Sequence, residues 1–188
     1  MKWITLFSQT GSEIVVIGDN IKRKPSLIVT NNRLETEYRY NSGLRELGTT
    51  IVKAKHDQLM DYLMTSSQID PKNTVITLHG YLRIIPPEVC ERFEIYNGHP
   101  APIEEYPELK GKDPQKRIWQ NKGKYNIIGS VVHRVTAGVD EGEVVSKYNV
   151  PNRLLDEGDT FATLRMTSLV AWQKFLNKRF EGVEIDNE

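Results

Sequence analysis

The chain has little cysteine and no excess of charge of either sign. Cys90 is the one cysteine among 188 residues, and 25 Lys and Arg balance 25 Asp and Glu. A single cysteine excludes an intramolecular disulfide and a multi-cysteine metal site, which fits a reducing compartment. Because the charges balance, no overall field attracts the chain to nucleic acid or to an anionic membrane surface. The residues around Cys90 favour a helix, so we expect a buried or bystander thiol.

Long hydrophobic runs, repeats and low-complexity tracts are also missing. No apolar run approaches the roughly 18 residues that a membrane span needs, and no basic and then apolar leader opens the chain. The length suits one domain with a proper core and is short for two. We therefore expect a soluble, cytoplasmic protein, with one catalytic domain at residues 1–180 and a frayed acidic tail at residues 181–188.

Strand-like and helix-like segments alternate along the first half of the chain. Short β-rich runs stand at Trp3–Phe7, Pro25–Thr30, Gly48–Val52, Val75–Leu78 and Glu94–Tyr96, and helical patterns at His56–Met64 and Pro87–Phe93. This rhythm predicts an α/β fold with a Rossmann-like, mostly parallel sheet flanked by helices. Ligands bind beyond the carboxyl ends of the strands in such sheets. The segments expected there are Ser8–Ser12, His79–Ile85 and Asn97–Pro100.

The second half predicts a β pair and a closing helix. Ile127–Thr136 and Gly142–Val150 are the expected strands, and the loop between them holds Asp140. Gly158–Phe180 is predicted as an amphipathic helix with Asp159 or Thr160 as its N-cap. Its expected face toward the sheet consists of Phe161, Leu164, Leu169, Trp172 and Leu176.

Asn97, His99 and Asp140 supply an amide, an imidazole and a carboxylate. An amine that attacks an activated one-carbon acyl group forms a tetrahedral oxyanion and must lose a proton. The Asn97 amide and a cationic His99 are suited to donate to that oxyanion, and Asp140 is suited to favour the imidazolium and to relay a proton through water. The alternative is a plain turn, because Asn-Gly is a common turn dipeptide.

Four blocks of sequence resemble the tetrahydrofolate-dependent formyltransferases, and within them the glycinamide ribonucleotide formyltransferases. In order they are Asn73–Glu88, Asn97–Pro100, Tyr106–Gly111 and Gly129–Thr136, the last followed by Val139–Gly142. The resemblance covers roughly residues 73–150, with weaker agreement in residues 1–20. It implies formyl transfer from 10-formyltetrahydrofolate to a primary amine, without a metal, and catalytic roles for Asn97, His99 and Asp140. The implied partners are folate and a small amine, and the chain is expected as a monomer or homodimer.

The resemblance also implies a site for the folate donor. The loop from His79 to Ile85 wraps the pterin in the family, so Leu82, Arg83, Ile84 and Ile85 are expected to bind it, closed by Val139 and Asp140. Apolar walls with a few placed hydrogen bonds suit such a ring. Arg83 meets either the glutamate tail or solvent. His79 departs from the family's small residue, and we expect it in a structural hydrogen bond. His133 is expected among apolar neighbours, supporting the reacting centre.

The acceptor is less determined by the sequence. Gly11 and Ser12 resemble the family's phosphate loop, but Glu13 stands where the family carries Asn, and a simple turn is the alternative. Lys110 and Lys112 suit a substrate anion, or form only a mobile polar loop. We expect glycinamide ribonucleotide of purine biosynthesis first, then an amino sugar nucleotide or a modified nucleotide. A formyltetrahydrofolate hydrolase using the same three polar residues, and a non-catalytic folate-binding protein, stay open. The chain's histidines show no metal-ligand spacing.

Overall fold

The structure is a computed structural model that describes residues 1–32 and 40–182. The chain divides into two compact units. The first comprises Met1–Asn97 and Val135–Gly138, and the second comprises Gly98–Arg134 and Val139–Glu188. One catalytic domain over residues 1–180 therefore stays a prediction. Residues 183–188 of the expected tail lie outside the described residues.

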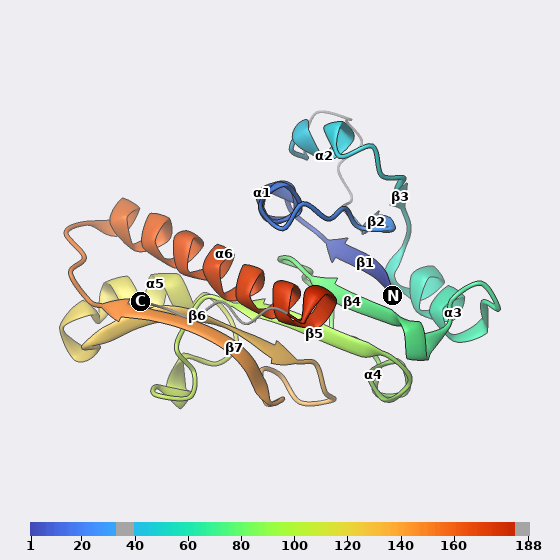
Figure 1. Cartoon of the computed structure of the whole chain (residues 1–188). Helices are drawn as coiled ribbons and strands as arrows, with labels where there is room; N and C mark the ends of the chain where they lie inside the picture. Colours follow the sequence, from blue (N-terminus) through green and yellow to red (C-terminus); the bar gives the residue numbers. More distant parts are fainter. Residues whose placement is uncertain (33–39, 183–188) are drawn as a thin grey trace. The chain divides into compact units, whose positions relative to one another are not determined.

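The first unit is built on parallel strands, as the alternating pattern predicts. The strands are β1 (Lys2–Phe7), β2 (Leu27–Thr30), β3 (Ile51–Lys53), β4 (Thr74–Leu78) and β5 (Glu94–His99), whose last two residues belong to the second unit. They pair in parallel in the order β3-β2-β1-β4-β5. The predicted Rossmann-like, mostly parallel sheet is confirmed (Figure 1).

Helices cover the strands of the first unit because β1 is apolar toward both faces. The helices are α1 (Ser12–Asn20), α2 (Gly43–Glu46), α3 (His56–Thr65) and α4 (Pro87–Arg92), with a 3-10 turn, η2, at Pro71–Asn73. Leu6 packs in one core cluster with Leu63 of α3, whereas Phe7 packs in another with Ile14 of α1. Successive strand residues point to opposite faces, so one strand supports two cores.

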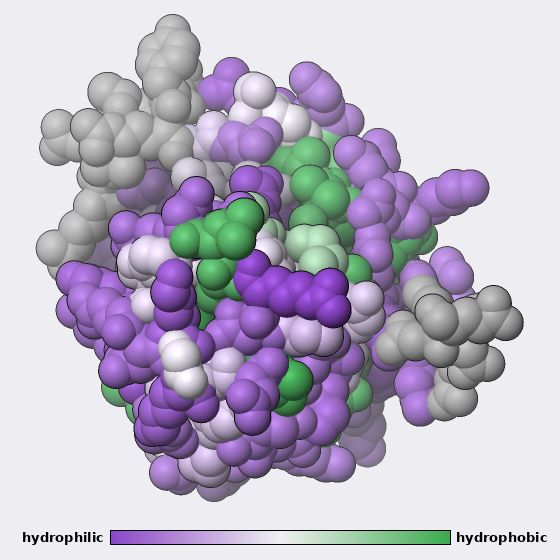
Figure 2. Space-filling view, turned by 90° about the vertical axis from the view of Figure 1, so that its left-hand side faces the viewer, coloured by the Kyte–Doolittle hydropathy of each residue, from purple (hydrophilic) through white to green (hydrophobic). Residues whose placement is uncertain are grey.

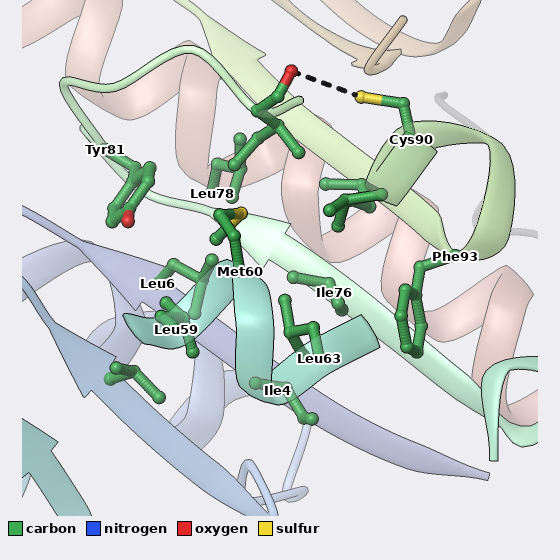
Figure 3. Packing of buried hydrophobic residues seen from close by; sticks show 14 of the residues in the cluster. Ile4, Leu6, Leu59, Met60, Leu63, Ile76, Leu78, Tyr81, Cys90 and Phe93 are labelled. Atoms are coloured by element: carbon green, nitrogen blue, oxygen red, sulfur yellow. Dashed lines mark hydrogen bonds between the residues drawn. The ribbon is translucent and has the colours of Figure 1, made fainter. Parts of the chain in front are cut away.

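Cys90 belongs to the first of these cores. Figure 3 shows its thiol at the edge of a cluster that includes Leu78, Met60 and Phe93. The Sγ–H donates to the Ile85 carbonyl oxygen at 3.7 Å, and the side chain is buried. A thiol in this setting behaves as a small hydrophobic group. The expectation of a buried thiol is confirmed.

The second unit pairs a β ribbon with a long helix. Strands β6 (Ile127–Arg134) and β7 (Val144–Pro151) run antiparallel, with an irregularity between Val132 and His133. Helix α6 (Glu157–Glu181) lies along both strands (Figure 1). The remaining elements are η3 (Pro107–Leu109), α5 (Pro114–Gln120) and η4 (Lys122–Lys124). The predicted β pair, with Asp140 in the loop between its strands, is confirmed.

Two expectations for α6 are wrong. The N-cap is Asp156, whose carboxylate accepts from the Asp159 N–H at 2.8 Å, because a cap side chain reaches the amide three residues on. Phe161 is 47% exposed, since the buried stripe starts one residue earlier, at Thr160. The stripe then follows helical spacing with small residues among the large ones. It comprises Thr160, Leu164, Thr167, Ala171, Trp172, Phe175 and Leu176.

The surface agrees with the balanced composition. The face drawn in Figure 2 is mostly hydrophilic, with hydrophobic residues in separate small patches. Within residues 1–32 and 40–182, no helix has the length and apolarity that a membrane crossing requires.

Candidate active site

Asp140 gathers two imidazoles and a backbone amide in the second unit. Its Oδ2 lies 3.2 Å from His99 Nδ1 and accepts from the Gly111 N–H at 2.8 Å, and its Oδ1 lies 3.2 Å from His133 Nε2. The side chains are 5% exposed for His99, 3% for His133 and 9% for Asp140. The sequence places these residues up to 41 positions apart, and the fold of this unit brings all three together.

The Asp140 carboxylate is held in its ionised form. Burial raises the pKa of Asp140, but hydrogen bonds from His133 and His99, the charge of His99 and the Gly111 N–H together lower that pKa well below its usual range. Its backbone is also unusual, with φ at +54° in the left-handed region. Non-glycine residues adopt this region rarely and at a cost, often at functional sites. This strained backbone conformation directs the carboxylate toward His99 and His133.

Both ring nitrogens of His99 face hydrogen-bond acceptors. Nδ1 faces the Asp140 carboxylate, and Nε2 lies 3.0 Å from the Leu109 carbonyl oxygen. An ionised carboxylate and a carbonyl oxygen only accept, so both contacts are hydrogen bonds when both nitrogens carry a proton. The arrangement therefore suits the imidazolium form of His99. It also means that each ring nitrogen of His99, the groups that could donate to an oxyanion, already faces an acceptor within the protein.

His133 is a buried histidine with a partner for each nitrogen. Besides Asp140, its Nδ1 lies 3.0 Å from the Arg134 carbonyl oxygen. The chain closes tightly beside it, because a Cβ at Gly142 would overlap that same Arg134 oxygen. The Asp-Glu-Gly sequence after Val139 thus turns the chain back against β6 and brings Asp140 to His133.

Asn97, Gly98 and His99 lie within strand β5, so the turn alternative for this tripeptide is wrong. Gly98 is required by packing. A Cβ at this position would stand 2.6 Å from Nε1 of Trp172 on α6, inside any normal contact distance. Asn97 is half-buried and is the last residue of this stretch in the first unit.

The loop expected to hold the pterin places its residues unequally. Leu82 and Ile84 are 67% and 71% exposed, and the Leu82 N–H donates to Ser8 Oγ at 2.8 Å. Ile85 packs into the core of the first unit, 2% exposed, so its side chain cannot form a wall of an open slot. Val139, in the second unit, is 55% exposed.

Arg83 lines a cavity of about 760 Å³ in the first unit. The cavity lies where β2 and β3 end and α3 begins, and Lys53, Lys55 and His56 line it as well. Asp57 lines it as well, as an acidic residue. Cationic side chains and a helix N-terminus around one cavity favour an anionic ligand group.

The two expected acceptor segments have different characters. Gly11 adopts a left-handed φ of +66° and precedes α1, as a strand-to-helix loop requires. The Glu13 carboxylate is bound to His79 Nδ1 at 2.7 Å, and His79 Nε2 lies 2.9 Å from Thr77 Oγ1. The expected structural hydrogen bond of His79 is confirmed. Lys112, by contrast, is an exposed side chain in the segment before α5.

Backbone groups of the Glu108–Gly111 segment are the part of the site that the sequence does not reveal. The Leu109 carbonyl and the Gly111 N–H carry no side-chain signature, although they contact His99 and Asp140. Arg117 of α5 donates to the carbonyl oxygens of Glu108, Leu109 and Lys110. An arginine one turn into a helix that follows a Gly-Lys-Asp-Pro loop is a weak signal for such a contact.

The cluster is not arranged as a metal site. His99 Nδ1 and His133 Nε2 point at the Asp140 oxygens, so these atoms pair with one another rather than converge on one point. No group of His, Cys, Asp and Glu side chains in the described part of the chain has the geometry to hold a metal ion.

Comparison with known proteins agrees with this fold. A family model described as "Formyl transferase" matches residues 52–168. Phosphoribosylglycinamide formyltransferase from Streptococcus pneumoniae TIGR4 is similar at 24% identity and a TM-score of 0.74, over 96% of this chain and 99% of that one. The Campylobacter jejuni protein of that name is similar at 18% identity and a TM-score of 0.78, over 96% and 97%.

A solved structure of another activity is similar as well. It is a formyltetrahydrofolate deformylase from Pseudomonas syringae pv. tomato, with 16% identity and a TM-score of 0.71. The match covers 100% of this chain and 64% of that one. At these identities the likeness to solved structures shows the shared fold.

Proposed function

Because the chain belongs to the formyl transferase family, we propose that it transfers the formyl group of 10-formyltetrahydrofolate to a primary amine, with glycinamide ribonucleotide as the acceptor. The resemblance of its sequence to this family, and the prediction of a formyltetrahydrofolate-dependent transferase, are confirmed at the level of the family. The acceptor and the role of each residue are proposals. The buried contact of His99 and His133 with Asp140 is the observation that supports the proposed chemistry.

The proposed chemistry starts with the amine of the acceptor attacking the formyl carbon. The C–N bond forms, the carbonyl oxygen becomes an oxyanion, and the amine must then lose its proton before the folate nitrogen leaves with one. Asn97 donates its amide N–H to the oxyanion. In an extended strand, side chains two residues apart share a face, which supports pairing Asn97 with His99.

His99 contributes positive charge in this proposal. Its two ring nitrogens already face Asp140 and Leu109, so the imidazolium acts on the oxyanion as a fixed charge in a buried setting. Asp140 holds that ring and, as an ionised carboxylate, accepts the proton of the attacking amine through water. His133 has a supporting role, since it fixes the second carboxylate oxygen of Asp140.

We propose that the donor site covers both faces of the pterin ring and binds the glutamate tail of the folate. Leu82, Ile84 and Val139 are exposed apolar side chains suited to cover a pterin, with the backbone of Ile85 and Asp140 for its polar edge. The cationic cavity at Arg83 supports binding of the glutamate tail. Arg83→Ala should therefore raise KM for the donor and leave kcat nearly unchanged, and the rise should shrink as salt is added.

The acceptor site is proposed at Gly11 and Ser12, with Lys110 and Lys112 as further cations for the substrate. Glu13 departs from the family at this loop, and an unpaired carboxylate there would repel a phosphate. Its contact with His79 turns the carboxylate toward a partner within the unit, which supports a phosphate at the remaining N–H groups. An amino sugar nucleotide or a modified nucleotide also offers the required phosphate and amine.

The function is tested by following tetrahydrofolate release from 10-formyltetrahydrofolate with and without candidate amines. We expect release when glycinamide ribonucleotide is present, and formylated amine in equal amount. Release without any amine would instead identify a hydrolase, a second candidate that the similar deformylase supports. Donor binding without turnover on any amine would identify a folate-binding protein and overturn the proposal.

The setting of the enzyme stays a prediction in three respects. We propose that both units act as one catalytic domain, that the protein is cytoplasmic, and that it is a monomer or homodimer. Sedimentation of the purified protein tests the last of these, and the donor and acceptor are proposed as its partners in every case.

A further inference from the structure

The strongest unassigned cluster lies around Arg117, beside the proposed catalytic residues. Arg117 belongs to α5 and is half-buried. Its Nη1 donates to the Glu108 carbonyl oxygen at 2.6 Å, and its Nη2 donates to those of Leu109 at 2.9 Å and Lys110 at 2.7 Å. One planar guanidinium thus holds three consecutive carbonyl groups. The guanidinium is suited to this, because it presents several N–H donors in a fixed planar fork.

The same short segment contacts both proposed catalytic side chains. The Leu109 carbonyl oxygen that accepts from Arg117 also lies 3.0 Å from His99 Nε2. Two residues later, the Gly111 N–H donates to Asp140 Oδ2. A displacement of this segment would therefore move the His99 ring and remove a hydrogen bond from the carboxylate at the same time.

The backbone directly after this segment adopts unusual conformations that require fixed contacts. Gly111 has a φ of +81° and Asp113 a φ of +53°, so the chain makes two left-handed turns within three residues. Because Asp113 is not a glycine, this conformation of its backbone is strained. The Asp113 carbonyl accepts the backbone N–H of Arg117 at 3.2 Å, which ties the far side of the same turn to the same residue.

We propose that Arg117 is a positioning residue for formyl transfer. Its guanidinium fixes the Glu108–Lys110 carbonyls, and these hold the His99 ring and the Asp140 carboxylate in their reactive geometry. The inference rests on the proposed roles of His99 and Asp140. Arg117 acts on the His99 and Asp140 side chains through the backbone carbonyl groups that it binds.

Steady-state kinetics of Arg117→Ala test the proposal. A misplacement of about 1 Å in a catalytic group costs about 10²-fold in rate, so kcat should fall by about that factor while KM for 10-formyltetrahydrofolate stays the same. Guanidinium chloride, far below the concentrations that unfold the protein, should restore part of the lost rate. Arg117→Lys should have a lower kcat than Arg117→Ala reaches with guanidinium, because an ammonium group lacks the planar fork.

Lys124→Ala is the matched control. Lys124 Nζ binds the Glu108 side chain at 2.6 Å, so this variant removes a cation from the same segment without touching its carbonyls. We expect it to keep the kcat of the unmutated protein. Should Arg117→Ala fail to fold, Arg117→Lys supplies the same comparison, and ring ¹⁵N resonances of His99 that stay unshifted in it would overturn the proposal.

The outcomes separate this inference from the proposed function. Full activity of Arg117→Ala beside an inactive His99→Ala refutes the positioning role and leaves the catalytic assignment standing. Full activity of His99→Ala refutes the catalytic assignment itself. A loss in Arg117→Ala that guanidinium does not reverse, with an equal loss in Lys124→Ala, indicates a merely structural segment and also refutes the proposal.

Discussion

His79 in the first unit and His99 in the second are both buried histidines that face a carboxylate, and they differ in what lies at the other ring nitrogen. His79 faces Glu13 through Nδ1 and the Thr77 hydroxyl through Nε2. His99 faces Asp140 through Nδ1 and the Leu109 carbonyl through Nε2. A hydroxyl can donate as well as accept, whereas a carbonyl only accepts.

The difference fixes which form of each ring is fully hydrogen-bonded. A neutral His79 donates from Nδ1 to Glu13 and accepts the Thr77 hydroxyl proton, while Thr77 Oγ1 accepts from Trp3 Nε1 at 2.9 Å. A neutral His99 would donate to only one of its two acceptors. A neutral His79 therefore satisfies both of its contacts, which suits a structural role. The arrangement around His99 suits an imidazolium, whose positive charge is suited to stabilise the oxyanion of the proposed reaction.

The largest expected effect comes from removing each imidazole in turn. His99→Ala should lower kcat by about 10²–10³, the usual loss for an oxyanion-stabilising group, with a small change in stability. His79→Ala should instead cost stability of about 1–3 kcal/mol, because Glu13 and Thr77 lose their partner, and should leave kcat close to the original. Turnover assays and thermal unfolding of both variants measure the contrast.

Similar kinetic losses in the two variants would show that His79 and His99 do not differ in their role in turnover. His79→Asn serves as the control for a general packing defect, since it keeps a polar group at the same place. If kcat falls strongly in His79→Asn while the fold persists, the ring in the first unit also takes part in turnover.

Asp140→Asn tests the ionised carboxylate next to His99 through the pH dependence of stability. The folded pKa of Asp140 lies below the unfolded value of about 3.9, so this carboxylate stabilises the fold fully above that value, and the contribution disappears as pH falls toward the folded pKa. The unmutated protein should be more stable than Asp140→Asn at pH 5, and the gap should narrow at pH 3. Urea unfolding at the two pH values measures the gap, and a gap that does not narrow contradicts the ionised carboxylate.

Gly98→Ala tests the packing that holds strand β5, which carries the proposed catalytic residues. A methyl group would meet Trp172 Nε1 at 2.6 Å, and overpacking of this kind costs about 1–3 kcal/mol. Because His99 follows directly, kcat should fall as well. Gly123→Ala is the matched control, since a Cβ there meets nothing within 4 Å. Equal stability of both variants would show that the Trp172 contact is not close.

The smallest effect is expected for Lys112→Ala. The side chain is 91% exposed, and its ion pair with Asp113 spans 4.0 Å. Exposed charges contribute roughly 1 kcal/mol at most, so KM for the amine should rise by no more than about fivefold. Lys116→Ala, another exposed lysine nearby, is the control. An equal rise in both would indicate general attraction rather than a contact of Lys112 with the acceptor.

The sequence predicts the elements and the side-chain cluster, because both leave local patterns. The alternation of strands and helices gives the parallel strands of the first unit, and the resemblance points to His99, His133 and Asp140. Neighbours in the fold decided the positions where prediction failed. The Asn97-Gly98 dipeptide predicts a turn, but both residues lie in strand β5. Glycine is needed at position 98 because Trp172, far along the chain, leaves no room for a Cβ.

Other failures have the same physical origin. Ile84 and Ile85 have identical side chains, and only the fold determines that Ile84 is exposed and Ile85 belongs to the core. Contacts made by backbone atoms, such as Leu109 with His99, leave no side-chain pattern at all. The Arg117 contacts therefore become visible only in the structure.

A double-mutant cycle in the rate of formyl transfer shows whether His99 and Asp140 work as one unit. His99→Ala, Asp140→Ala and the double variant are compared with the unmutated protein at saturating donor and amine. Residues that act together show strongly non-additive losses. We predict that the double variant loses little more than the worse single variant. Losses that multiply would show that the two side chains act independently, so that Asp140 does not act on the reaction through His99.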